Sequence, residues 1–285
     1  MLYERYFNIA DINIKIESDI FWDVSDKYKI FETTQIHPDV IFKIDAEHQI
    51  EFSHFNSVFK DGLMEIFQYE KEIIKVMYTD LEKREIDWCM HLSKDNVYTL
   101  YFYQIDKHNL EAFSILYFLE LSLFLIKNNA MMLHASVVEY KGKGILFTAP
   151  SGTGKSTQAS LWEEKLGAEI INGDRAIIRK LHNYEVFGSP LAGSSNIYKN
   201  KKVPLRCIVI LRQAKFNKIK KISMREAYIC LISEFSISPW NREVIDEQSK
   251  WVLQLIKEVP VYMLECLPNE DAVKILKNEI EGNID

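Results

Sequence analysis

The first part of the chain alternates apolar and polar side chains over several short runs. Four segments show this alternation or are rich in β-branched and aromatic residues: residues 12–16, 40–44, 73–78 and 97–103. A period of two is typical of strands that bury one face. We therefore expect a smaller, β-rich N-terminal domain over residues 1–109, in which residues 54–64 show no clear period.

The longest apolar run of the chain covers residues 113–126 and contains Glu120. A membrane-spanning helix needs about 20 apolar residues, so this run is too short to cross a bilayer. Because it is apolar on every side, we predict a buried helix that connects the two parts of the chain over residues 110–130.

Strands and helices are predicted over residues 131–285, after a polar break at residues 127–129. Residues 133–139 and 144–149 have the composition of two strands joined by a hairpin turn. Further strands are predicted at residues 169–171, 175–181, 184–187, 205–211 and 261–264. Helices are predicted at residues 242–258 and 269–280, and Ser223 with Glu226 forms the capping box of another. This order predicts an α/β domain.

The strand at residues 144–149 runs directly into a glycine-rich turn and a helix. Glycines at 152 and 154 allow several backbone N–H groups to converge on an anion, and the positive end of the following helix adds to the attraction. Lys155 would reach the β- and γ-phosphates, and the Ser156 hydroxyl would reach Mg²⁺. The predicted nucleotide-binding residues of this phosphate-binding loop (P-loop) are Ser151, Gly152, Thr153, Gly154, Lys155, Ser156 and Thr157.

One position departs from the full P-loop pattern, because Ala149 stands where the pattern has glycine. Alanine in a left-handed or crowded position costs about 1 kcal/mol relative to glycine, so we interpret Ala149 and Pro150 as a stiffened exit from the strand. The alternative is an ordinary strand, turn and capped helix. Such a helix has no need of a lysine between its last glycine and a Ser-Thr pair.

Charge and cysteine content narrow the function classes. The formal net charge of the 285 residues is −6, which argues against a general nucleic-acid-binding surface. The four cysteines show no CxxC spacing, so we expect buried, reduced thiols and a cytoplasmic protein. The first residues do not resemble a signal peptide, and no membrane association is expected.

Two further side chains are candidates for the site. Asp174 lies 19 residues after Lys155, where a strand that follows the loop helix would end. A carboxylate there can hold Mg²⁺ or take a proton from an attacking hydroxyl, although a purely structural aspartate is the alternative. His134 lies on the strand that should pair with the loop strand, and taken alone it could be a core histidine.

These segments together resemble a known family. The sequence from His134 to Ser136, the glycine-rich loop, and residues 170–175 (Ile-Ile-Asn-Gly-Asp-Arg) are similar to HPr serine kinases and PEP carboxykinases over roughly residues 131–211. The resemblance implies a P-loop domain with a mixed sheet, in which His134 lies beside the metal and the reacting group. It also implies that Lys155 binds phosphate and that Ser156 and Asp174 bind the metal. The kinase branch fits better, because the carboxykinases are much larger and this sequence shows no arginine constellation for oxaloacetate.

The chain departs from the family pattern at Gly173, where the family has the first of two aspartates. Proton removal would then fall to Asp174, to His134 or to a residue that the sequence does not identify. The loop at residues 188–195 is shorter than the signature loop of HPr kinases, so HPr need not be the substrate.

Positive and hydroxyl side chains near this loop are further candidates. Arg175 and Lys199 could face the transferring phosphate, and Ser194 and Ser195 belong to a loop that could wrap around phosphate or substrate. An ordinary surface loop is the alternative. The lysine runs at residues 199–202 and 215–221 are typical of solvated turns, or they could dock an acidic peptide.

The sequence therefore predicts an ATP- and Mg²⁺-dependent kinase that phosphorylates a serine of a protein or peptide. The alternatives are a small-metabolite kinase on the same fold and a nucleotide-binding regulatory module without turnover. The N-terminal domain is expected to present substrate or to form an oligomer contact, because an open strand edge can pair with another chain.

Overall fold

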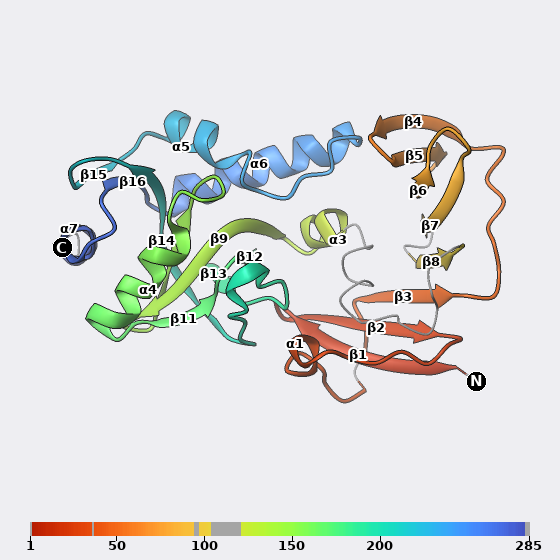
Figure 1. Cartoon of the computed structure of the whole chain (residues 1–285), viewed down its shortest axis with the longest axis horizontal. Coiled ribbons are helices and arrows are strands. Elements are labelled where there is room, and N and C mark those ends of the chain that lie inside the picture. Colours follow the sequence, from red (N-terminus) through yellow and green to blue (C-terminus); the bar gives the residue numbers. More distant parts are fainter. Residues whose placement is uncertain (1, 36, 94–96, 104–120, 283–285) are drawn as a thin grey trace. The chain divides into compact units, whose positions relative to one another are not determined.

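The computed structural model describes residues 2–35, 37–93, 97–103 and 121–282 (Figure 1). The chain divides into two compact units, an N-terminal unit (Met1–Leu121) and a C-terminal unit (Ser122–Asp285). Most of the helix predicted at residues 113–126 lies outside the described residues, and its last part is α3 (Leu121–Lys127). No helix in the described part of the chain is long and apolar enough to cross a membrane.

The N-terminal unit is an eight-stranded sheet with the order β1-β2-β3-β8-β7-β6-β5-β4. Its strands are β1 (Tyr3–Ile9), β2 (Ile12–Ser18), β3 (Val40–Asp45), β4 (Asn56–Asp61), β5 (Met64–Tyr69), β6 (Glu72–Asp80), β7 (Glu85–Leu92) and β8 (Tyr98–Phe102), with a short helix α1 (Asp26–Lys29). The pairs β2–β3 and β3–β8 are parallel and the others are antiparallel.

The sequence predicted part of this sheet. In β2 the alternation of Ile12, Ile14 and Ile16 is confirmed, since these side chains are buried and their neighbours are partly exposed. Residues 54–64, which have no apolar period, contain β4 and lead into β5. Five of the six β4 residues are exposed, so hydrogen bonding to β5, rather than burial of one face, forms this strand.

The C-terminal unit is also built on a mixed sheet. Its strands are β9 (Ala130–Tyr140), β10 (Lys143–Thr148), β11 (Glu169–Asn172), β12 (Arg175–Lys180), β13 (Tyr184–Phe187), β14 (Lys202–Gln213), β15 (Lys218–Lys221) and β16 (Val261–Cys266). Its helices besides α3 are α4 (Lys155–Leu166), the 3₁₀ turn η2 (Gly193–Ser195), α5 (Met224–Leu231), α6 (Arg242–Glu258) and α7 (Glu270–Gly282).

Strand β10 has a neighbouring strand on each side and sets the position of the loop that follows it. It pairs antiparallel with β9 and parallel with β14, and β14 also pairs in parallel with β16. The predicted hairpin between β9 and β10 is confirmed, with Lys141 and Gly142 in the left-handed conformation that such turns need. Residues 205–211 are confirmed as a central strand within β14.

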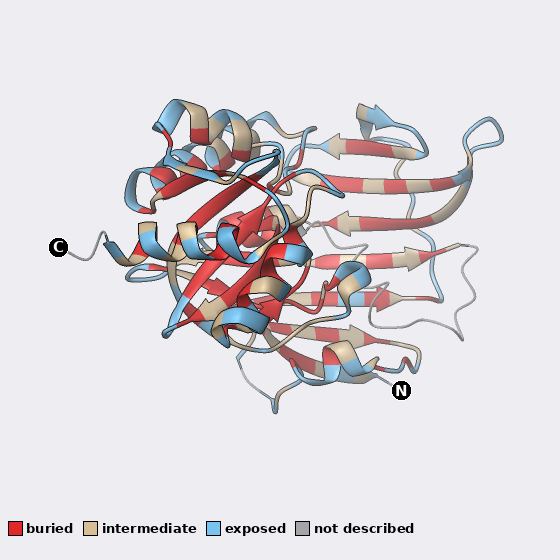
Figure 2. Cartoon of the chain, turned by 60° about the vertical axis from the view of Figure 1, so that its left-hand side comes forward, coloured by how far each residue is buried: buried red, intermediate tan, exposed pale blue. Residues whose placement is uncertain are grey.

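Two hydrophobic cores pack against this sheet. One core contains residues of α5 and α6, and the other contains residues of α4 and α7. Figure 2 shows the corresponding pattern, in which buried residues fill the strands while the helices expose one side. The helix predicted at residues 242–258 is confirmed as α6, capped by the Asn241 side chain. The four cysteines are free.

One segment of the C-terminal unit differs from the sequence prediction. Residues 218–221, expected to be part of a solvated turn, form strand β15, which pairs antiparallel with β16 at the end of the sheet. Three of its four residues are exposed. Lysines on an edge strand oppose pairing with another chain, which accounts for a charge run inside a strand.

Candidate functional site

The glycine-rich loop connects the carboxyl end of β10 to the first turn of α4. Gly152 has φ +77° and Gly154 has φ +120°, both in the region that favours glycine. Ala149 is buried but is not among the residues with positive φ. The backbone penalty expected for alanine at this position is therefore absent, since its conformation is one that any residue adopts.

Lys155 is the first residue of α4 and its side chain is largely enclosed, with 7 % of the residue exposed. Its Nζ donates hydrogen bonds to the carbonyl oxygens of Ala149 at 2.8 Å and Pro150 at 3.4 Å. Burial lowers the pKa of Lys155, and the carboxylates of Glu234 and Asp174 partly oppose this effect. The loop thus folds around its own lysine.

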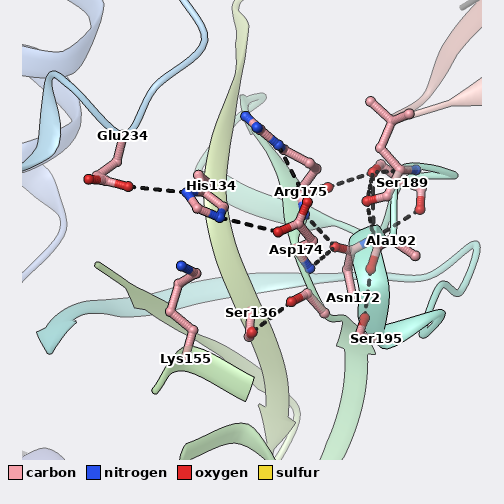
Figure 3. Close-up of polar contacts among 12 residues, drawn as sticks. His134, Ser136, Lys155, Asn172, Asp174, Arg175, Ser189, Ala192, Ser195 and Glu234 are labelled. Atoms are coloured by element: carbon pink, nitrogen blue, oxygen red, sulfur yellow. Dashed lines mark hydrogen bonds and ion pairs between the residues drawn. The ribbon is translucent and has the colours of Figure 1, made fainter. Parts of the chain in front are cut away.

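His134 lies on β9 between two carboxylates (Figure 3). Its Nε2 is 3.2 Å from Oδ1 of Asp174, and its Nδ1 is 3.3 Å from Oε2 of Glu234. A protonated imidazole can donate from both nitrogens, one to each carboxylate. The ring is thereby oriented from both sides, with its Nε2 edge toward Asp174.

Backbone pairing places the two acids beside His134. Arg175 pairs with His134 between β12 and β9, and the Ala135 amide donates to the Asp174 carbonyl at 2.8 Å. On the other side of β9, the His134 amide donates to the Glu234 carbonyl at 2.9 Å. Leu133 forms a β-bridge with Phe235, so the residues after α5 run alongside β9.

Glu234 was not among the predicted site residues. It lies 100 positions after His134 and belongs to no motif. Only the antiparallel pairing of its segment with β9 brings its carboxylate to the histidine. No signal in the sequence could have identified it.

The turn that presents Asp174 is held by Asn172. The buried Asn172 side chain accepts hydrogen bonds from the amides of Asp174 at 2.9 Å and Arg175 at 2.8 Å. Its Nδ2 donates to the Ser189 carbonyl at 2.9 Å. Asn172 therefore connects the Asp174 turn to the loop at residues 188–196.

Gly173 and Gly193 let this loop approach the acid closely. A Cβ at Gly173 would lie 1.9 Å from Oγ of Ser195, and a Cβ at Gly193 would lie 2.7 Å from Cγ of Asp174. Gly193 also has φ +55°. The space in which a side chain at position 173 would lie is thus filled by Ser195.

One cavity of about 260 Å³ joins the loop to the acid. Its walls come from the glycine-rich loop and from Lys155, Ser156, His134 and Asp174, with Ser194 and Ser195 on one side. Figure 3 shows the Lys155 ammonium directed toward the side of the site that holds His134 and Glu234. Ten predicted site residues from four separate stretches of sequence therefore line one cavity.

Three predicted residues do not line this cavity. Arg175 lies next to it, with Nε 3.5 Å from Oδ2 of Asp174. Lys199 instead pairs with Glu169, with Nζ 2.8 Å from Oε1. Thr153, from the loop itself, lines the neighbouring cavities.

No group of three or more His, Cys, Asp or Glu side chains within the described ranges is arranged to hold a metal ion. The oxygen-bearing side chains of Ser156 and Asp174 line the same cavity. Oxygen ligands of this kind, completed by phosphate and water, are typical of Mg²⁺ sites.

The fold and the site define a mixed α/β protein in which a lysine-bearing glycine loop faces a histidine–carboxylate cluster. The chain belongs to the family described as SynChlorMet cassette protein ScmC, whose model matches residues 105–269, more than half of the sequence. No curated protein matches the chain.

The chain is also similar to a solved structure, the HPr(Ser) kinase/phosphatase from Coxiella burnetii. The two are 12 % identical, the match covers 53 % of this chain and 93 % of the other, and the TM-score is 0.30. The predicted resemblance to HPr kinases is therefore confirmed only at the coarse level of a mixed α/β architecture. A TM-score this low does not support a conclusion about function.

Proposed function

We propose that the protein is an ATP- and Mg²⁺-dependent phosphotransferase that transfers the γ-phosphoryl group to a serine hydroxyl of a protein or peptide. The observation that supports this proposal is the single cavity shared by the glycine-rich loop, Lys155 and the His134–Asp174 pair. Anion binding and proton transfer are the two elements that phosphoryl transfer requires, and here their residues face one space.

The residues of this cavity are suited to bind a nucleoside triphosphate and Mg²⁺. Gly152 and Gly154 leave open space where a Cβ would be, so the loop amides are accessible to an anion. Ser156 and Asp174 offer oxygen ligands suited to Mg²⁺. When bound, ATP would supply the phosphoryl group and Mg²⁺ would offset its negative charge.

The protein's own groups then have distinct tasks. Lys155 exchanges its contacts with the Ala149 and Pro150 carbonyls for phosphate oxygens, which gives its buried charge a partner of opposite sign. Asp174 accepts the proton of the serine hydroxyl as the new Oγ–P bond forms and the bond to ADP breaks. His134, held by Glu234, orients Asp174.

A second candidate function is a nucleotide-binding module without turnover. It is favoured by Gly173, because Ser195 fills the position at which a second carboxylate would stand. Both candidates bind nucleotide, and they differ in whether a phosphoryl group is transferred.

The test of the proposal is phosphoryl transfer from γ-labelled ATP to a set of serine-containing peptides. We expect labelling by the unmutated protein and a loss of about 10²–10⁴-fold in Asp174→Asn, with ATP still bound. The matched control is Asp271→Asn, an exposed aspartate on α7. Labelling by Asp174→Asn at the parental rate would contradict the role of Asp174, and ATP binding without any labelling would favour the second candidate.

A further inference from the structure

A second cavity, of about 420 Å³, adjoins the glycine-rich loop on the side of α4 and the strand ends. Its walls come from the loop and the first turn of α4, from the end of β14 at Leu211 and Gln213, and from Cys266 at the end of β16. Gly152, Gly154 and Thr157 line both this cavity and the one that contains Lys155 and Asp174. A ligand can therefore extend from one cavity into the other past the loop.

Gln158 gives this second cavity a specific chemical feature. The residue is 2 % exposed and lines the cavity. Its Nε2 contacts Sγ of Cys266 at 3.5 Å, whereas its Oε1 has no hydrogen-bond partner among the described residues. Reversing the amide leaves the other polar atom without a partner, so the conclusion does not depend on the assigned orientation.

A buried amide atom without a hydrogen bond lowers the stability of the fold unless a ligand supplies the missing partner. Burial removes the water that would otherwise satisfy this atom, and no protein group among the described residues replaces it. Figure 1 shows the elements that carry these residues, α4, β14 and β16, in one region of the C-terminal unit. The remaining wall is largely apolar, with Leu211, Leu267 and Pro268. A largely apolar wall with a small number of polar groups is typical of a site for a flat heterocycle.

We propose that this cavity binds the nucleobase of the triphosphate and that Gln158 selects adenine. This inference rests on the proposed function and adds where the base lies and which residue selects it. Adenine offers an amino donor beside a ring nitrogen acceptor, which matches the oxygen and nitrogen of a glutamine amide. Guanine offers two acceptors on the same edge, so its O6 would face Oε1 of Gln158 without a proton between them.

The experiment compares four ligands by calorimetry with the full chain and Mg²⁺: ATP, GTP, inorganic tripolyphosphate and purine riboside triphosphate, which lacks the amino group. We expect ATP to bind about tenfold more tightly than purine riboside triphosphate, the effect of about one net hydrogen bond. GTP is expected to bind at least about tenfold more weakly than ATP for the reason given above.

The variant Gln158→Met keeps the side-chain length and removes the amide. It should weaken ATP binding about tenfold, to the level of purine riboside triphosphate, and leave tripolyphosphate binding unchanged. The matched control is Gln254→Met, an exposed glutamine on α6, which should change none of these affinities. Should Gln158→Met fail to fold, the comparison of ligands on the unmutated protein still decides.

Equal affinity of the unmutated protein for ATP and purine riboside triphosphate would overturn the adenine assignment. If tripolyphosphate binds while the bases are not distinguished, this inference fails and the proposed function stands. If tripolyphosphate and ATP both fail to bind, the proposed function fails and the inference fails with it.

Discussion

Lys155 combines burial with a charge that the proposed function needs. Only 7 % of the residue is exposed, and its ammonium is held by two carbonyls of its own loop. Burial lowers its pKa relative to an ordinary lysine. The folded state therefore binds this proton less tightly than the unfolded state, and the burial cost disappears as pH rises through the lowered pKa.

This shift predicts the pH dependence of anion binding. Tripolyphosphate affinity should fall as Lys155 loses its charge, at a pH below the ordinary lysine value of about 10.4. Lys155→Arg should keep its affinity to higher pH, because guanidinium stays charged. The measurement is a calorimetric titration at a series of pH values, and an identical decline in the arginine variant would show that another group is responsible.

At the scale of single residues, the sequence was sufficient to predict the site residues that belong to a motif. Lys155, Ser156 and the loop glycines follow one another in the chain, so their spacing fixes their geometry. Asp174 could be proposed because a strand that follows the loop helix would end there, and His134 because it lies on the strand that pairs with the loop strand. Glu234 could not be proposed, since its position depends on a segment after α5 pairing with β9.

At the scale of elements, the contact between the β11–β12 turn and η2 shapes the acid side of the site. Gly173 stands in that turn, and Ser195 Oγ fills the space beside it while donating to the Ala192 carbonyl at 2.7 Å. Ser136 on β9 donates to the Gly173 carbonyl at 2.8 Å, which holds the turn from the other side. A side chain at position 173 thus has no room unless η2 moves.

We expect Gly173→Ala to lower the free energy of unfolding by about 1–3 kcal/mol, since the new Cβ would overlap Ser195. In a Ser195→Gly background, Gly173→Ala should lower the free energy of unfolding by less, because the Oγ and Cβ atoms of Ser195 that the new methyl group would overlap are absent. Urea denaturation of the four proteins of this cycle measures the coupling. Equal costs in both backgrounds would show that the contact does not limit the turn.

Elements were predictable where local signals and burial agree. The limits of α6 follow from its Asn241 cap and its apolar positions, and the β9–β10 turn follows from its glycine. Strands β4 and β15 have mostly exposed side chains and so carry no period. These strands form because a neighbouring strand supplies hydrogen-bond partners, which a local pattern cannot reveal.

At the scale of the whole molecule, the proposed chemistry lies in the C-terminal unit. The family match begins at residue 105, after the last strand of the N-terminal sheet, and includes the loop, His134, Asp174 and Glu234. The N-terminal sheet lies outside that match. Substrate presentation or oligomer contact by this sheet stays a prediction.

The central claim is that the glycine-rich loop and Lys155 bind the triphosphate of a nucleotide. The most direct test is calorimetric titration of the full chain with ATP and Mg²⁺, alongside Lys155→Ala and the control Lys165→Ala. Lys165 lies at the far end of α4 and pairs with Glu164 at 2.7 Å. The account predicts ATP binding that Lys155→Ala weakens about 10–100-fold, the effect of a lost charged hydrogen bond, and that Lys165→Ala leaves unchanged. Absence of ATP binding to the unmutated protein, or equally tight binding by Lys155→Ala, would contradict it.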